Sequence, residues 1–177
     1  MEMAFANQED VFAVLERVLP PIFAKYGTYN VASTAPFVRI PYLEAMDTYG
    51  SDKPDLRIDL KLQDATQLLS GCGFGPFEGN TVKAVVVTDF TGTRKQIDGL
   101  CSEVESGEKA YWFRYDENGD IVGGISKFVQ PIKDQVVSAL GLTKGCFVGL
   151  TAGKLLTAQK TAGILRSKLG AFCPNHM

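Results

Sequence analysis

The sequence of 177 residues has little histidine, and its single one, His176, lies beside the end of the chain. It therefore offers no good candidate for a Ser-His-Asp triad or a histidine general base, which need a histidine held by its neighbours. The four cysteines lie 29, 45 and 27 residues apart, without a C-x-x-C pair. This spacing does not favour a zinc site, and we expect reduced thiols that mostly pack as small apolar side chains. They are Cys72, Cys101, Cys146 and Cys173.

Long apolar runs are also missing. The two longest stretches without a charged residue, 26–38 and 65–77, have 13 residues each. A helix that spans a membrane needs about 18 or more apolar residues. The first five residues are acidic where a secretory signal would be basic. These features predict a cytoplasmic protein without a transmembrane helix.

Acidic residues are absent after Asp134, so the formal net charge of −2 hides a difference between two parts of the chain. Residues 1–134 carry thirteen Lys or Arg against twenty Asp or Glu, which gives a net charge of −7. Residues 135–177 have a net charge of +5. Two interpretations stay open: a solvated outer face of a terminal helix, or a surface that contacts phosphates or an acidic neighbouring domain. The five basic residues are Lys144, Lys154, Lys160, Arg166 and Lys168.

The composition, 45% hydrophobic and 21% charged, is that of a globular protein with one medium domain, or one domain and a piece of another. Residues 3–5 are strand-like, and Asn7 can cap a helix whose apolar residues recur from Val11 to Leu19. Pro20 and Pro21 disturb that helix unless the apolar residues after them prolong it. A second helix is expected at 42–49, behind Pro41, followed by turn residues at 50–55.

The rest of the chain alternates strand and helix patterns. These patterns predict an α+β fold, a mostly antiparallel sheet of about four strands with helices packed on one face. The expected elements are a strand at 81–88, a helix from Thr93 to near Gly107, a strand at 110–115, a hairpin turn at 116–120, a short strand at 121–125, a helix at 128–140, a strand at 146–150 and a helix at 155–169.

Two kinds of candidate motif do not indicate a site by themselves. The glycine-rich segment 71–77 contains G-x-G, but no strand precedes it directly and Pro76 interrupts any following helix, so it lacks the context of a dinucleotide-binding loop. The acidic cluster at 116–120 has the composition of a solvated turn. Asp52 and Asp55 also lie among turn residues, but the sequence of the segment around them carries a further signal.

That segment resembles a known family. Residues 42–57, with E-A-M-x-x-Y-G-S-D-K-P-D-L-R, resemble the part of bacterial-type aspartyl-tRNA synthetases that leads into their inserted domain. Residues 2–5 resemble the end of the motif 2 strand of class II synthetases, and residues 9–11 the helix start after it. Residues 124–128, together with the order of strands and helices, are similar to the GAD domain. That domain is shared with the B subunit of the tRNA-dependent amidotransferase.

The resemblance implies a domain organisation and a longer parent protein. Residues 1–57 would be a partial catalytic-domain segment, 58–170 the inserted GAD domain, and 171–177 the start of the return to the catalytic domain. The parent has an anticodon-binding OB-fold, a class II catalytic domain, ATP and Mg²⁺ as cofactors, and a homodimeric state. No position here matches its catalytic, substrate or metal-binding residues, so we expect a fragment that holds no cofactor and is inactive alone.

The parent reaction implied by the resemblance attaches aspartate to tRNA with ATP, and the chain would be an accessory module near the tRNA acceptor end. Alternatives are a structural module that docks on the rest of the synthetase, or a module of the amidotransferase B subunit. Candidate tRNA-facing residues are Lys154, Lys160, Arg166 and Lys168. A candidate hinge, or a loop close to the active site, is formed by Ser51, Asp52, Lys53, Asp55 and Arg57.

Overall fold

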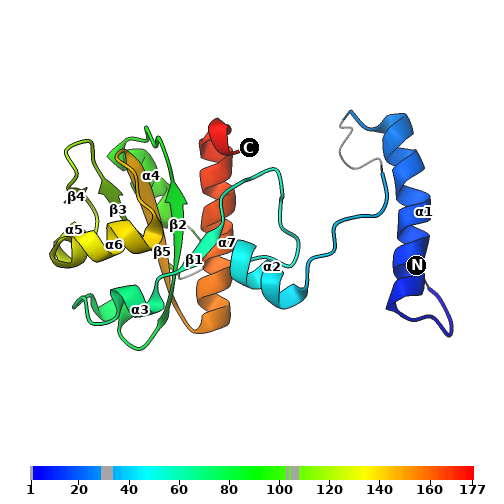
Figure 1. Cartoon of the computed structure of the whole chain (residues 1–177), viewed down its shortest axis with the longest axis horizontal. Coiled ribbons are helices and arrows are strands. Elements are labelled where there is room, and N and C mark those ends of the chain that lie inside the picture. The colour runs from blue at the N-terminus through cyan, green and yellow to red at the C-terminus, as the bar shows by residue number, and fades with distance from the viewer. Residues whose placement is uncertain (1, 29–33, 103, 105–107) are drawn as a thin grey trace. The chain divides into compact units, whose positions relative to one another are not determined.

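The computed structural model describes residues 2–28, 34–102, 104 and 108–177, and the chain forms two compact units, residues 1–40 and 41–177 (Figure 1). The division follows contacts within this chain. The domain boundaries expected at residues 57 and 170 come from a resemblance and stay a prediction. Helix α2 (Tyr42–Tyr49) and the loop after it pack with the second unit.

The first unit is built on helix α1 (Gln8–Tyr26), which starts at the predicted cap. The Asn7 side chain accepts hydrogen bonds from the backbone N–H groups of Glu9 and Asp10, at 2.9 and 3.2 Å. The Asp10 carboxylate accepts one from the Asn7 N–H in return, at 2.9 Å. Pro20 and Pro21 lie inside the helix without ending it, so the apolar residues after them do prolong it.

Residues at both ends of this unit lack regular structure. The segment 3–5 is a bend with Phe5 at a φ of 55°, which no strand contains, so the expected strand is wrong. Residues 34–40 fold back on α1. There Arg39 pairs with Glu9 at 2.8 Å and lies 4.5 Å above the ring of Phe12. This contact supplies part of the packing that an isolated helix lacks.

The second unit contains an antiparallel sheet, which confirms the predicted α+β class. Among the described residues the sheet has five strands in the order β1-β2-β5-β3-β4 rather than about four. The strands are β1 (Leu62–Asp64), β2 (Thr81–Val87), β3 (Ala110–Tyr115), β4 (Ile121–Val122) and β5 (Cys146–Gly153). Strand β1 has only three residues and none of them is β-branched, so its sequence carries little strand signal.

Helices cover both faces of the sheet, and the expected single covered face is wrong. Helices α7 (Leu155–Phe172) and α4 (Arg94–Ser102) pack on one face. Helices α3 (Thr66–Leu69), α5 (Ser126–Val129) and α6 (Lys133–Leu140) pack on the other. Along β2, Val85 and Val87 join the first core and Val82 and Ala84 the second. A nearly continuous apolar strand is typical of a sheet buried on both sides.

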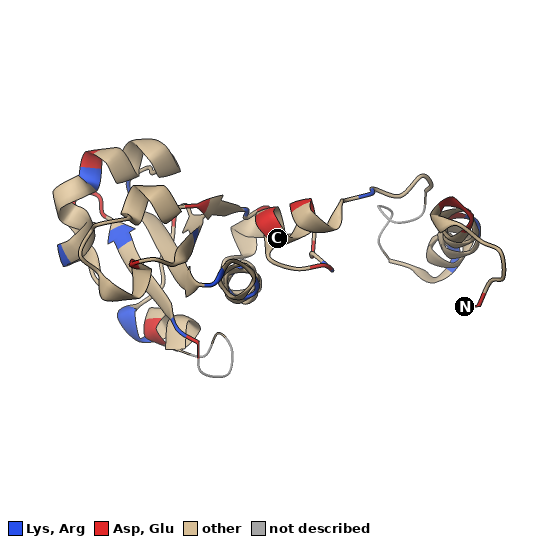
Figure 2. Ribbon diagram, turned by 90° about the horizontal axis from the view of Figure 1, so that it is seen from below, with Lys and Arg blue, Asp and Glu red and all other residues tan. Residues whose placement is uncertain are grey.

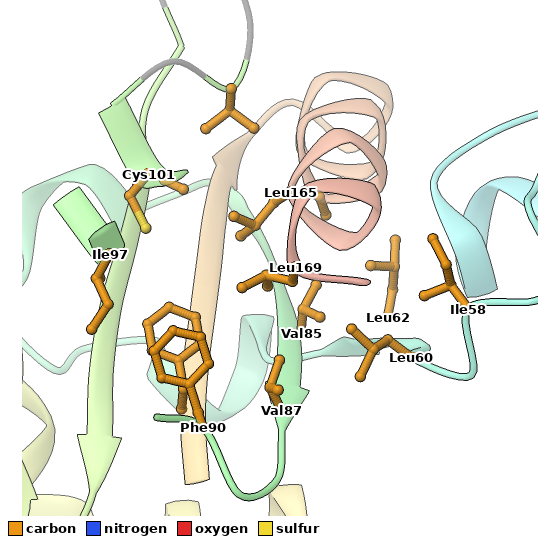
Figure 3. Packing of buried hydrophobic residues seen from close by; sticks show 14 residues of the cluster. Ile58, Leu60, Leu62, Val85, Val87, Phe90, Ile97, Cys101, Leu165 and Leu169 are labelled. Carbon is orange, nitrogen blue, oxygen red and sulfur yellow. The ribbon is translucent and has the colours of Figure 1, made fainter. Parts of the chain in front are cut away.

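The core on the α7 side joins residues far apart in the sequence (Figure 3). Ile58 and Leu60 from the loop after α2 meet Leu165 and Leu169 of α7 and Val85 of β2. Stacked aromatic rings fill its far end, where the centroids of Phe90 and Phe147 lie 4.6 Å apart. The loop after α2 is therefore part of this core rather than an appendage.

Prolines and glycines account for the other departures from the predicted elements. The expected helix 128–140 is three pieces, because Pro131 lies in a 3-10 turn, η3 (Gln130–Ile132), between α5 and α6. The expected strand 121–125 ends at Val122, since Gly123 and Gly124 have positive φ angles. The predicted end of a helix near Gly107 lies outside the described residues. Two further 3-10 turns of the same length are η2 (Gly75–Phe77) and η4 (Pro174–His176).

The cysteines are free thiols, two of them buried and two half-buried. Burial raises the pKa of the Cys101 thiol to about 12, so it is a neutral core side chain at ordinary pH. Within the described residues no helix is both long and apolar enough to cross a bilayer.

Candidate functional site

A groove with a volume of about 490 Å³ lies between α2 and α7 in the second unit. It brings together two of the predicted basic residues and two of the predicted loop residues, from segments more than a hundred positions apart. The lining residues are Tyr42, Met46, Gly50, Ser51, Asp52, Lys160, Gly163, Ile164, Ser167 and Lys168.

The groove exists because two backbones meet at a pair of glycines. Helix α2 ends at Gly50, which has a left-handed φ of 67° and donates its N–H to the Met46 carbonyl. Its backbone lies directly against α7. A Cβ atom on Gly50 would lie 2.6 Å from the Gly163 nitrogen, and a Cβ on Gly163 would lie 2.7 Å from the Gly50 carbonyl carbon. Neither position can hold a larger residue without moving α2.

Arg166 fastens the loop after α2 to α7 from inside the protein. Its side chain is 1% exposed. Nε donates to the carbonyl of Leu60 at 2.6 Å, and Nη2 donates to those of Ile58 and Asp55 at 2.6 and 2.9 Å. The guanidinium carbon lies 5.0 Å from the centroid of the Tyr49 ring. Burial lowers the pKa of Arg166 from its ordinary value.

The predicted surface position of Arg166 is therefore wrong. Helix α7 is buried on two sides, by the sheet and by the loop after α2. The side against the loop carries Arg166, with Gly163 and Gly170 packed against Gly50 and Ile58 of that segment. Gly163, Arg166 and Gly170 follow one helix face (i, i+3, i+7), and the two glycines on it were the available signal for a close-packed side. The guanidinium of Arg166 donates its hydrogen bonds to backbone carbonyls inside the protein and does not face a phosphate.

The charged residues of the loop pair mainly with each other. The Asp55 carboxylate accepts from Arg57 Nε at 2.9 Å, from Nη2 at 2.6 Å and from the Arg57 N–H at 3.0 Å. Hydrogen bonds from Arg57 lower the pKa of Asp55 to about 2. The Asp52 carboxylate pairs with the Lys53 ammonium at 3.1 Å. The Ser51 hydroxyl accepts from the Lys53 N–H at 3.1 Å. The loop is closed by local contacts as well as by Arg166.

The three predicted lysines occupy different places on α7 and at its N-cap, a segment that carries basic residues (blue in Figure 2) and no acidic one. Lys160 is exposed on the groove, and Lys168 lines it while half-buried. The pKa of Asp52 is lowered, first by Lys53 and to a smaller degree by Lys160. Lys154 is exposed at the start of α7 and does not line the groove. The structure thus gathers Lys160 and Lys168 with the loop and leaves Lys154 apart.

An ionic cluster around a buried lysine, beside the groove, was missed by sequence reasoning. Lys83 of β2 is 2% exposed, and its ammonium lies 2.6 Å from the Asp47 carboxylate and 3.0 Å from that of Asp64. Gln159 of α7 donates to Asp47 at 3.4 Å. Burial alone would lower the pKa of Lys83, but hydrogen bonds to both carboxylates outweigh it and the pKa is raised. The cluster ties α2 to the sheet. A lysine within a β-branched strand was the available signal.

Comparison with known proteins assigns most of the chain to one family, which agrees with the resemblance seen in the sequence. Residues 1–134 match the model of the class II tRNA synthetases (D, K and N). This range includes α1, α2, the loop at 50–57 and the sheet through β4.

Three curated relatives match almost all of the chain. An aspartate–tRNA ligase of Streptomyces avermitilis is 41% identical over 94% of the chain. An aspartate–tRNA(Asp) ligase of Deinococcus radiodurans is 39% identical and an aspartate–tRNA(Asp/Asn) ligase of Treponema denticola 37% identical, each over 96% of the chain. The chain spans 29–30% of the length of these relatives, which are enzymes. By its family match and these identities, the chain belongs to the class II tRNA synthetases and aligns with a segment of the bacterial aspartate–tRNA ligases.

Proposed function

We propose that the chain works as an accessory segment of an aspartate–tRNA ligase, which attaches aspartate to tRNA with ATP. The observation that carries this proposal is an identity of 37–41% to ligases of that name over 94–96% of the chain. The chemistry would belong to the rest of the enzyme, together with ATP and Mg²⁺. In this proposal residues 58–170 are the inserted domain, and no residue described above is catalytic.

The proposed task of the segment is to assist the acceptor end of tRNA. Helix α7 and its N-cap residue support it, because together they carry four basic residues and no acidic one. Three of the four, Lys154, Lys160 and Lys168, are exposed or half-buried. A basic helix without acidic residues attracts phosphates and makes binding depend on salt.

A second candidate is a purely structural module that docks on the rest of a synthetase. It is favoured by the apolar surface of α2, where Tyr42 is 57% and Leu43 78% exposed. Exposed apolar side chains that lie together are a common mark of protein contacts. The ligase names of the relatives favour both candidates over the amidotransferase module.

Binding of tRNA to the chain separates the two candidates. We expect the chain to bind tRNA more weakly at about 200 mM than at about 50 mM salt, and the double variant Lys160→Gln, Lys168→Gln to reduce the salt slope by about 2, since each phosphate contact contributes about 1. Fluorescence anisotropy of labelled tRNA measures both. Lys95→Gln on α4 removes one exposed charge far from α7 in sequence and is the control.

If the double variant binds tRNA like the unchanged chain at both salt concentrations, α7 does not contact phosphates. The second candidate, a module that docks on the rest of a synthetase, would then be the better explanation of the basic charge on α7.

A further inference from the structure

Helix α2 has the features of an element that opens separately from the rest of its unit. It has eight residues, and its N-cap, Pro41, makes no side-chain hydrogen bond to the helix start. Isolated helices of this length are marginal in water, so tertiary contacts must hold it. Its residues Ala45 and Met46 are buried, whereas Tyr42 and Leu43 are 57% and 78% exposed. A small buried face and an exposed outer surface are typical of segments with low local stability.

The acidic residue at the end of α2 is placed against the helix dipole. Asp47 lies in the last turn, at the negative end of the dipole, and that turn carries no basic residue. On local grounds alone an asparagine would suit this position better. The Asp47 carboxylate instead pairs with the ammonium of Lys83 in β2, at 2.6 Å. Any stabilisation that this carboxylate gives to α2 must therefore come from the sheet and not from the helix itself.

The ion pair between α2 and the sheet is asymmetric. The side chain of Lys83 is 2% exposed, whereas those of Asp47 and Asp64 are 64% and 55% exposed. Asp64 of β1 also binds the ammonium, at 3.0 Å, so Lys83 keeps a carboxylate partner when Asp47 moves away. The Asp47 carboxylate can move into water, because water already reaches it. The pair thus has a fixed half on the sheet and a movable half on α2.

The segment that can open ends where Arg166 holds the loop after α2. Arg166 donates to three backbone carbonyls of that loop, and the first of them belongs to Asp55. These hydrogen bonds do not involve α2, so they remain when α2 moves. Only the contact of the guanidinium with the Tyr49 ring, 5.0 Å from its centroid, would be lost. The movable segment is therefore residues 41–54.

We propose that residues 41–54 form a strap that opens from α7 while the sheet stays folded, and that the pair of Asp47 with Lys83 keeps the strap closed. Opening separates Gly50 from Gly163 and removes the α2 wall of the groove. Weakening the pair favours any partner that binds the open form, and strengthening it favours any partner of the closed groove. The strap goes beyond the proposed function and does not depend on the binding of tRNA.

Hydrogen exchange of the backbone amides, measured on the whole chain, tests the strap. The amides from Ala45 to Gly50 donate to carbonyls inside α2 or at its start, and we expect them to exchange at least about tenfold faster than those of β2 and β5. Asp47→Asn is expected to speed exchange at α2 by a further factor of about ten or more, the size of one hydrogen bond to a charged group. Asp52→Asn is the matched control. It makes the same change in the exposed pair with Lys53 and is expected to alter exchange by about twofold or less.

A second background shows whether Asp47 acts through Lys83. Both carboxylates of the cluster are more than half exposed and stay solvated without the ammonium, so Lys83→Met is expected to fold, which thermal melting checks. In this background Asp47→Asn is expected to slow exchange at α2 slightly. The substitution then only removes an acid from the negative end of the helix, so the sign of its effect reverses.

Three outcomes overturn the proposal. The first is exchange at α2 in the unchanged chain that is as slow as in β2 and β5, because α2 would then not open separately. The second is Asp47→Asn without faster exchange at α2. The third is the same acceleration by Asp47→Asn with and without Lys83, which would mean that Asp47 acts through another group. The first two need no change at Lys83, and none of the three bears on tRNA binding, so the proposed function is tested separately.

Discussion

Replacing Arg166 by methionine is expected to lower the free energy of unfolding by about 3–5 kcal/mol. The change removes the hydrogen bonds to the carbonyls of Asp55, Ile58 and Leu60 while the side-chain stem stays similar in size. Two of the three bonds are buried, and a buried acceptor left without a donor costs about 1–3 kcal/mol. The cation–aromatic contact with Tyr49 is lost as well. Urea unfolding followed by circular dichroism measures the effect.

Two comparisons separate the carbonyl clamp from a general effect of charge. Arg166→Lys keeps the charge but not the planar fork, so we expect an intermediate loss of stability. Lys154→Met removes an exposed charge from the N-cap of the same helix and is expected to change stability by about 0.5 kcal/mol or less. An Arg166→Met variant with an unchanged urea midpoint would show that the clamp contributes nothing.

Gly163→Ala is expected to destabilise the second unit by about 2–3 kcal/mol. The added methyl group would lie 2.7 Å from the carbonyl carbon of Gly50, which belongs to backbone and cannot rotate away. Helix α2 must then shift from α7, and overpacking of this kind costs about 1–3 kcal/mol. The groove between the two helices should change shape with it, since both glycines line it.

The matched control is Gly99→Ala in α4. Outside the helix's own backbone, no atom of the described residues lies within 4 Å of a Cβ at Gly99, and the residue is exposed inside a helix. Alanine is the better helix former, so this variant is expected to gain about 0.5–1 kcal/mol. Equal stability changes for the two glycine variants would mean that α2 and α7 are not in backbone contact.

Local structure in this chain follows from short sequence signals. The cap at Asn7, the β-branched run of β2 and the glycine behind α2 each act within a few residues, and the structure has all three where they were predicted. Thr93 likewise exchanges hydrogen bonds with Gln96 ahead of α4. Local signals fail where contacts with distant residues determine the secondary structure. Strand β1 forms because it pairs with β2, not because of its own composition.

The candidate site was predicted only in part, because its key contacts join distant residues. Lys160, Lys168 and the loop at 51–57 were candidates from charge and resemblance, and the glycine pair explains why they meet. Arg166 looked like the other basic residues of α7. It differs because carbonyl groups more than a hundred residues earlier in the chain fold against it, which no local pattern records. Lys83 is buried for the same kind of reason.

The most direct test of the proposed function is a graft. This chain would replace the matching segment of the Streptomyces avermitilis aspartate–tRNA ligase, its 41% identical relative. If the segment serves the aspartylation of tRNA, the graft charges tRNA with aspartate with a Michaelis constant for tRNA within about tenfold of the parent, a difference of about 1.4 kcal/mol or less. A folded graft that still exchanges pyrophosphate in the presence of aspartate but does not charge tRNA would contradict it.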